Sequence, residues 1–168
     1  MATFGDLVEH SNDGSFLSGE MQLCKFSVAT AAIVSSMSAF TRVASGTGKM
    51  RFAIFDDDGE PNVLKWVSSE KTFTNTTFAW NSANVLGTWS NLAAGNYWLC
   101  VWPGASIIVA YGTYPAGTGW WVEGKTYHAT NNPASPFTGG EDYDVNINVY
   151  ATYTVPASGN PYYYRAQQ

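Results

Sequence analysis

The sequence predicts an all-β protein, and three observations lead to that fold class. The 168 residues include 16 Gly and 7 Pro, spread so that turn residues interrupt the chain at short intervals. Between them Thr, Val, Tyr, Phe and Trp predominate, and aromatic residues make up 15% of the chain, as is typical of strands. The turns recur about every 8–12 residues, which favours a sandwich or barrel of about 8–10 mostly antiparallel strands over alternating strands and helices.

The clearest strand is predicted near the C-terminus, from Tyr143 to Tyr153. Apolar and aromatic residues alternate there with polar ones such as Asn146 and Asn148. Because successive side chains of a strand point to opposite faces, one face of this strand belongs to a core and the other to solvent.

A second alternating strand precedes an acidic turn. Met50, Phe52 and Ile54 form its apolar face, and Lys49, Arg51 and Ala53 form a face predicted to be exposed. The turn holds Asp56, Asp57, Asp58, Gly59 and Glu60, and the next strand runs from Val63 through Trp66. These carboxylates fit turn geometry better than calcium ligation, because the alternate-residue spacing of a calcium loop is missing.

The segment Tyr97–Trp102 is apolar on both faces. This pattern predicts a central strand that is covered on each side, or one whose outer face meets another chain. Two further strands are expected at Met21–Ala29 and Ala32–Val43, and a helix over Ala29–Phe40 is the competing interpretation because Ala and Met favour helices.

Composition excludes several classes of partner. Only 12% of the residues are charged and the net charge is −5, with no cluster of Lys or Arg to contact a nucleic-acid backbone. No run approaches the roughly 20 apolar residues of a membrane-spanning helix. The first residues lack the basic and apolar segments of a signal peptide, so we expect either a protein that stays inside the producing cell until lysis or one whose leader was removed.

The sequence contains few residue patterns that would support catalysis or bind a cofactor. His10 and His128 belong to no metal-binding pattern, and neither a nucleophile elbow nor a phosphate loop occurs. A pair of carboxylates alone would suffice for a glycosidase, but most acidic residues lie in turns. Cys24 and Cys100 are interpreted as two buried thiols, with a single disulfide as the alternative. We therefore expect no enzyme, no cofactor and no metal.

A long charge-free segment is the most unusual feature. No Asp, Glu, Lys or Arg occurs over the 51 residues from Thr72 to Val122, which contain eleven aromatic residues. Strand alternation sends some of these outward, so part of the aromatic surface is expected to be covered by a partner. The candidates lie in or beside a Gly- and Pro-rich loop and suit either a glycan or a protein interface: Tyr111, Tyr114, Trp120 and Trp121.

The last residues differ from the rest of the chain. Pro and Gly end the final predicted strand, so residues 1–154 form one predicted domain and residues 155–168 a tail. This tail carries Tyr162, Tyr163, Tyr164 and Arg165, a composition found in protein interfaces. It is either frayed or docked on a neighbouring subunit.

Three segments between Met21 and Thr154 resemble a known type of module. Residues 52–55, before a turn that ends in Gly59-Glu60-Pro61, look like the strand-turn-strand opening of jelly-roll modules in phage virion proteins and bacterial surface proteins. Residues 91–99, Asn-Leu-Ala-Ala-Gly-Asn-Tyr-Trp-Leu, resemble the Leu-x-Ala-Gly-x-Tyr-Trp-Leu signature of these modules, and residues 143–153 resemble their ending.

The resemblance implies a jelly-roll β-sandwich with a layout like that of carbohydrate-binding modules. Such modules are generally non-catalytic parts of attachment, decoration or fibre structures. We therefore expect a structural protein on the surface of a phage virion, made in the host cytoplasm, that decorates the head or forms part of a tail or fibre. Its expected partners are other virion proteins and itself, with a trimer favoured. The alternative is a carbohydrate-binding or adhesion module that uses surface Trp and Tyr.

Overall fold

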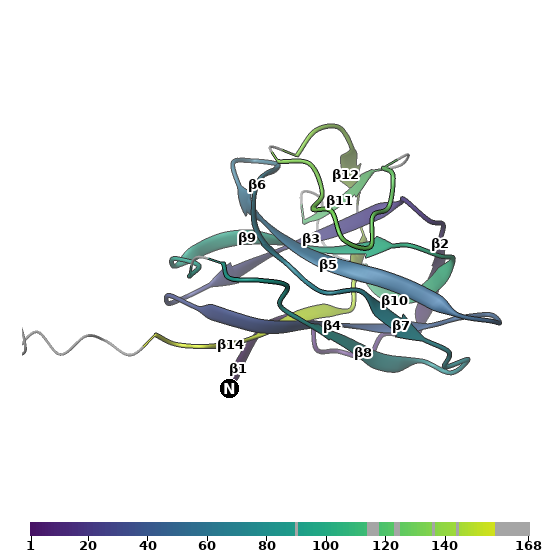
Figure 1. The fold of residues 1–168 in the computed structure, drawn as a ribbon. Helices are drawn as coiled ribbons and strands as arrows, with labels where there is room; N and C mark the ends of the chain where they lie inside the picture. Colours follow the sequence, from purple (N-terminus) through teal and green to yellow (C-terminus); the bar gives the residue numbers. More distant parts are fainter. Residues whose placement is uncertain (90, 114–117, 123–124, 136, 144, 157–168) are drawn as a thin grey trace, which may run out of the picture.

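The protein folds as two antiparallel β-sheets packed face to face (Figure 1). The computed structural model describes residues 1–89, 91–113, 118–122, 125–135, 137–143 and 145–156. All strand pairings within this part of the chain are antiparallel. The prediction of an all-β sandwich is thus confirmed.

Within the described residues each sheet contains seven strands. Sheet A has the order β1-β14-β4-β10-β13, with β2 paired to β10 and β8 to β4. Its strands are β1 (Ala2–Gly5), β2 (Asn12–Phe16), β4 (Ile33–Arg42), β8 (Ala79–Asn84), β10 (Ile107–Thr113), β13 (Val145–Ile147) and β14 (Val149–Thr154). Sheet B has the order β12-β11-β3-β9-β5-β6, with β7 paired to β5. Its strands are β3 (Met21–Val28), β5 (Gly48–Asp57), β6 (Pro61–Val67), β7 (Lys71–Phe73), β9 (Gly95–Pro103), β11 (Gly119–Val122) and β12 (Glu141–Tyr143).

The longer predicted strands correspond to β3, β4, β5, β6 and β9. The helix considered over Ala29–Phe40 is wrong, because β4 occupies most of this range. The described residues contain 14 strands, more than the 8–10 expected, since β1, β7, β11, β12 and β13 have only three or four residues each and are too short to show an alternation. No helix of the described chain is long and apolar enough to cross a membrane.

The C-terminal strand predicted from Tyr143 to Tyr153 is divided between the two sheets. β12 pairs with β11 in sheet B, whereas β13 and β14 belong to sheet A. Ile147, Val149 and Ala151 face the core as predicted. Asn148 departs from the alternation because it is fully buried, at 0% exposed, where the strand is interrupted between β13 and β14. Its side-chain amide donates to the carbonyl of Val8, so it ties the segment after β1 to sheet A.

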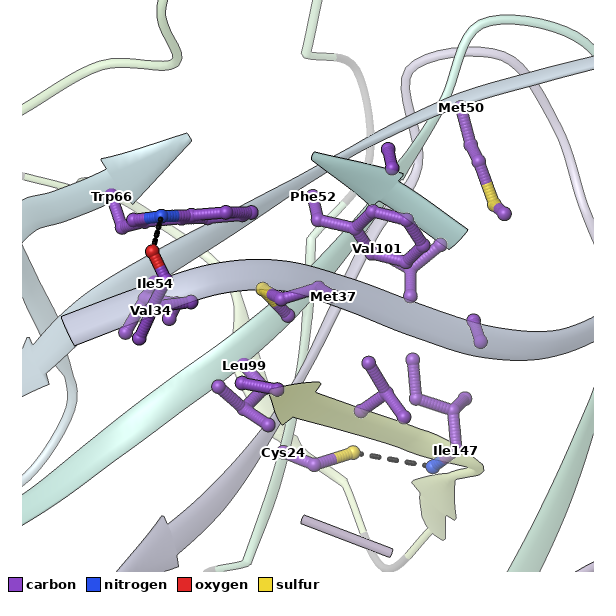
Figure 2. Close-up of a cluster of buried hydrophobic side chains, with 14 of the residues drawn as sticks. Cys24, Val34, Met37, Met50, Phe52, Ile54, Trp66, Leu99, Val101 and Ile147 are labelled. Carbon is purple, nitrogen blue, oxygen red and sulfur yellow. Dashed lines mark hydrogen bonds between the residues drawn. The ribbon is translucent and has the colours of Figure 1, made fainter. Parts of the chain in front are cut away.

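The main hydrophobic core lies between the two sheets. Met37 of β4 meets Phe52 of β5 and Leu99 of β9 there, and the three side chains are completely buried (Figure 2). Trp66 Nε1 donates to the Val34 carbonyl at 3.3 Å, which gives this buried indole a partner from the opposite sheet. We call this cluster the sandwich core.

A second hydrophobic cluster covers the outer face of sheet B. It contains Phe55, Trp98, Trp102 and Phe137, and we call it the outer core. Residues 125–135 and 137–140, the covering loop, arch over the sheet (Figure 1). The prediction of an exposed outer face on β5 holds for Lys49, which is exposed, but is wrong for Arg51 and Ala53, which are both 0% exposed under this loop. The prediction that the segment Tyr97–Trp102 is covered on both faces is confirmed, and the cover on its outer face is the chain's own loop.

Both cysteines are free buried thiols, as interpreted from the sequence. Cys24 belongs to the sandwich core and Cys100 to the outer core. The two side chains therefore lie on opposite faces of sheet B, where no disulfide can join them. Cys24 Sγ accepts a hydrogen bond from the Ile147 backbone N–H at 3.2 Å (Figure 2).

Candidate functional site

Tyr111 and Trp120, two of the four aromatic residues proposed as a partner surface, belong to different sheets. Tyr111 lies on β10 of sheet A and packs, partly buried, against the sandwich core. Trp120 lies on β11 of sheet B, packs against the outer core, and donates from Nε1 to the Gly139 carbonyl at 3.2 Å. Tyr114 lies outside the described residues. The structure therefore does not bring Tyr111 and Trp120 onto a common face.

Trp121 follows Trp120 on β11, so its side chain points to the other face of the strand. It lines a shallow hollow of about 400 Å³ together with Lys125, Gly140 and Glu141. This hollow lies where the covering loop joins β12. Trp121 is half-buried there, and it is separate from the outer core that Trp120 contacts.

The chain itself covers most of the outward aromatic surface of sheet B. Trp98 is 1% exposed, meets Trp120 edge to face at 6.0 Å between ring centroids, and donates from Nε1 to Asp57 Oδ1 at 2.9 Å. Trp102 is 2% exposed and meets Tyr127 of the covering loop edge to face at 5.3 Å. These two tryptophans act as core residues, and their buried rings offer no surface to another molecule.

Arg51 holds the covering loop from beneath. Its Nε donates to the Ser68 carbonyl at 2.9 Å, and its Nη1 donates to the carbonyls of His128 and Asn131. Burial lowers the pKa of this guanidinium, and the nearby Tyr127 and Glu70 partly oppose the shift. Burial and the hydrogen bond of its hydroxyl to Glu70 Oε2, 2.8 Å long, raise the pKa of Tyr127. The polar residues between sheet B and the covering loop thus have a structural role, which is to hold the loop on the sheet.

The acidic turn and the histidines also have structural contacts. Asp56 pairs with Lys65 at 2.8 Å and accepts the Val63 backbone N–H at 2.6 Å, as a hairpin turn requires. Asp57 pairs with Lys25 at 3.3 Å. His10 Nε2 lies 3.0 Å from Asp6 Oδ2, and His128 is exposed. Among the described residues no group of three or more His, Cys, Asp or Glu is placed to hold a metal ion.

Another aromatic site lies at one end of the sandwich, in the segment between β8 and β9. Two adjoining hollows, of about 180 and 450 Å³, share Trp89, Asn91 and Leu92. The smaller one reaches Ile33, and the larger one reaches Lys65 and Tyr97. We call the two hollows together the Trp89 groove.

Hydrogen bonds from three directions set the walls of the Trp89 groove. The Trp89 indole N–H donates to the Leu86 carbonyl at 2.7 Å, across a turn in which Gly87 adopts a left-handed φ of 77°. Leu92 and Ala32 exchange two backbone hydrogen bonds of 2.9 Å each, which tie the segment to the start of β4. Tyr97 is 7% exposed, and its hydroxyl donates to the Ala93 carbonyl at 3.1 Å. The walls are therefore formed without a ligand.

Exposed apolar side chains gather around this groove. Ile33 is 42% exposed, Leu86 is 39% exposed and Val155 is 58% exposed. The last residue of β14, Thr154, pairs with Ile33, so the described chain ends beside the groove. Sequence analysis missed Trp89 as a site residue, because in the charge-free segment nothing separates it from the tryptophans that became core.

The groove offers apolar contact with polar groups at its rim. The side chains of Thr88 and Asn91 supply hydrogen-bonding groups, and Lys65 is already paired with Asp56. Such a surface can bind an aromatic side chain or the apolar face of a sugar, and the described lining residues include no acid-base pair. Comparison with known proteins found no family model and no curated protein that matches the chain.

Proposed function

We propose that this protein is a non-enzymatic structural component of the exterior of a phage particle, as a head decoration or as part of a tail or fibre. In this proposal the sandwich is a jelly roll that associates with copies of itself and with other particle proteins. The sequence resemblance between Phe52 and Tyr153 supports the jelly-roll and virion assignment. The two packed antiparallel sheets agree with that layout at the coarser level of a sandwich.

The observation that carries the proposal is the apolar end of the sandwich. Ile33, Leu86 and Val155 stand exposed around the Trp89 groove, while the aromatic face of sheet B is already covered by the chain's own loop. A groove with an exposed apolar rim is typical of protein interfaces. Contacts of this kind depend little on ionic strength, because apolar burial is not screened by salt.

A matched pair of surface variants tests the proposal. Light scattering measures the solution mass over a range of protein and salt concentrations, and we expect an oligomer, with a trimer favoured, that persists at high salt. Leu86→Glu, beside the groove, should return the mass to the 18.2 kDa monomer. Leu17→Glu is the control, since Leu17 is 60% exposed and follows β2, outside the groove. A monomeric wild type, or equal effects of the two variants, would contradict the proposal.

Carbohydrate binding is the second candidate function, and the combination of Trp89 with Asn91 in one hollow favours it. An indole face with a neighbouring amide can bind the C–H face and the hydroxyl edge of a sugar. Titration with soluble polysaccharides should then change the tryptophan fluorescence in a saturable way. Trp89→Ala should abolish that change, whereas Trp121→Ala should preserve it.

A further inference from the structure

We propose that the Trp89 groove binds the segment Tyr162–Arg165 of a second copy of the chain. This inference rests on the proposed function, because it names the partner of the self-associating end. The segment itself lies outside the described residues, and three features support its binding there: the groove, the point where the described chain ends and the sequence that follows.

The first argument is position. β14 ends at Thr154, which is the register partner of Ile33, and Ile33 lines the groove. All residues after Thr154 therefore start from the rim of this groove. From Val155 to Tyr162 an extended chain reaches about 25 Å at roughly 3.3 Å per residue, far enough for the tyrosines to contact an adjacent molecule.

The second argument is chemical fit. The hollows of about 180 and 450 Å³ have mixed walls, in which Trp89, Leu92 and Ile33 supply the apolar part. Aromatic rings gain most from such walls, and a tyrosine also keeps a hydroxyl that needs a polar partner. Thr88 and Asn91, both exposed, provide such partners at the rim.

The third argument is charge. At this end of the sandwich Lys25 is paired with Asp57 and Lys65 with Asp56. Asp58 and Glu60, in the turn between β5 and β6, form no ion pair with any described residue. The only charged side chain in residues 155–168 is Arg165. Arg165, next to the tyrosines, would therefore bring a positive charge to the carboxylates of Asp58 and Glu60.

A second copy fits better than the same molecule. β14 points outward at the end of the sandwich (Figure 1), and Pro156 biases Val155 toward an extended backbone, which continues the outward direction of the strand. Pro161 biases Asn160 in the same way. A segment that leaves β14 in an extended conformation can reach the Trp89 groove of a neighbouring molecule directly. To occupy the groove of the same molecule, the segment would have to reverse its direction.

A mixing experiment tests the exchange between copies. One variant replaces Tyr162, Tyr163 and Tyr164 by Ser and keeps the groove, and the other, Thr88→Arg, obstructs the groove and keeps the tail. Thr88 is exposed, so the second variant leaves the sandwich core in place, and Trp89→Ala serves as a further groove variant. Each variant alone should be monomeric by light scattering. An equimolar mixture should form a one-to-one dimer, because one intact tail then meets one intact groove.

The outcomes separate this inference from the proposed function. A mixture that stays monomeric, while the wild type associates, overturns exchange between copies and leaves self-association standing. A triple serine variant that associates as well as the wild type also overturns the role of the tail, again without touching the proposed function. A wild type that is monomeric at every concentration overturns both.

Discussion

Arg51 is the residue that departs furthest from what its sequence context suggests. It alternates with apolar neighbours on β5 as an exposed residue would, yet it is 0% exposed. Its Nη2 has no acceptor among the described residues, and no ion pair of this part of the chain includes it. A buried cation of this kind costs free energy, which the hydrogen bonds to three carbonyls offset. We infer that Arg51 serves mainly to hold the covering loop.

Replacing Arg51 by Met should therefore destabilise the protein and release the covering loop. Hydrogen bonds to a charged donor contribute about 1.5–3 kcal/mol each, and removal of the desolvated charge offsets part of the loss, so we expect a decrease of about 3 kcal/mol in the free energy of unfolding. Urea denaturation measures this change, and limited proteolysis should give new cuts between residues 125 and 140. Arg42→Met is the control, since the exposed pair of Arg42 with Asp13, 3.0 Å long, should contribute less than about 1 kcal/mol. Equal losses for the two variants would contradict this role.

The two buried thiols predict a loss of stability in alkaline solution. Burial raises the pKa of Cys24 and of Cys100, so both thiols stay protonated in the folded protein. In the unfolded chain they ionise near pH 8.5, and above that pH each thiol lowers the free energy of unfolding by about 1.4 kcal/mol per pH unit. Below pH 8.5 both states are protonated and the effect vanishes.

The variant Cys100→Ala isolates one of these thiols, because Cys100 lies in the outer core and forms no hydrogen bond in the described structure. Urea denaturation in reducing buffer at pH 8 and pH 10 should show that the variant loses about 2 kcal/mol less than the wild type over this interval. Equal losses would show that the Cys100 thiol is accessible to ionisation in the folded state.

At the scale of elements, periodicity predicted the long strands well. The double-sided apolar pattern of β9 identified the centre of sheet B and left open whether the chain or a partner covers it. The covering loop could not be predicted, because its residues show no period and its contacts, such as the hydrogen bonds from Arg51, are with residues remote in the sequence. Gly104 illustrates this: a side chain there would lie 2.3 Å from the Tyr127 ring, so only glycine admits the loop this closely.

The candidate site was predicted less well than the fold. The charge-free segment did indicate excess aromatic surface, but Trp98, Trp102 and Trp120 pack in or against the outer core, whereas Trp89 packs, partly buried, against the sandwich core and also lines the groove. These tryptophans differ in the residues that each indole ring contacts, and those residues are remote in the sequence. Strand alternation assigns a side chain to a face and says nothing about what lies above that face.

For the whole molecule, the connection from β12 to β13 joins the two layers. β12 closes the edge of sheet B beside β11, and β13 begins the part of sheet A that continues as β14. The covering loop leads directly into β12. The chain therefore passes from the loop that covers the outer core into sheet B at β12, and then into sheet A at β13. The sandwich core and the outer core also share the strand β9, whose alternate residues belong to each. We therefore expect the two cores to lose their structure together.

This coupling predicts a single unfolding transition, although the chain is slightly longer than the roughly 150 residues below which two-state behaviour is usual. Tryptophan fluorescence includes Trp98 and Trp102 of the outer core together with Trp66 of the sandwich core, and far-UV circular dichroism reports on both sheets. The two signals should change at the same urea concentration in the wild type. In Arg51→Met the fluorescence should change first, because a loosened loop exposes the outer core while the sheets persist. Separate transitions in the wild type would instead show that the covering loop docks as an independent unit, and the shared strand β9 would not be enough to couple the two cores.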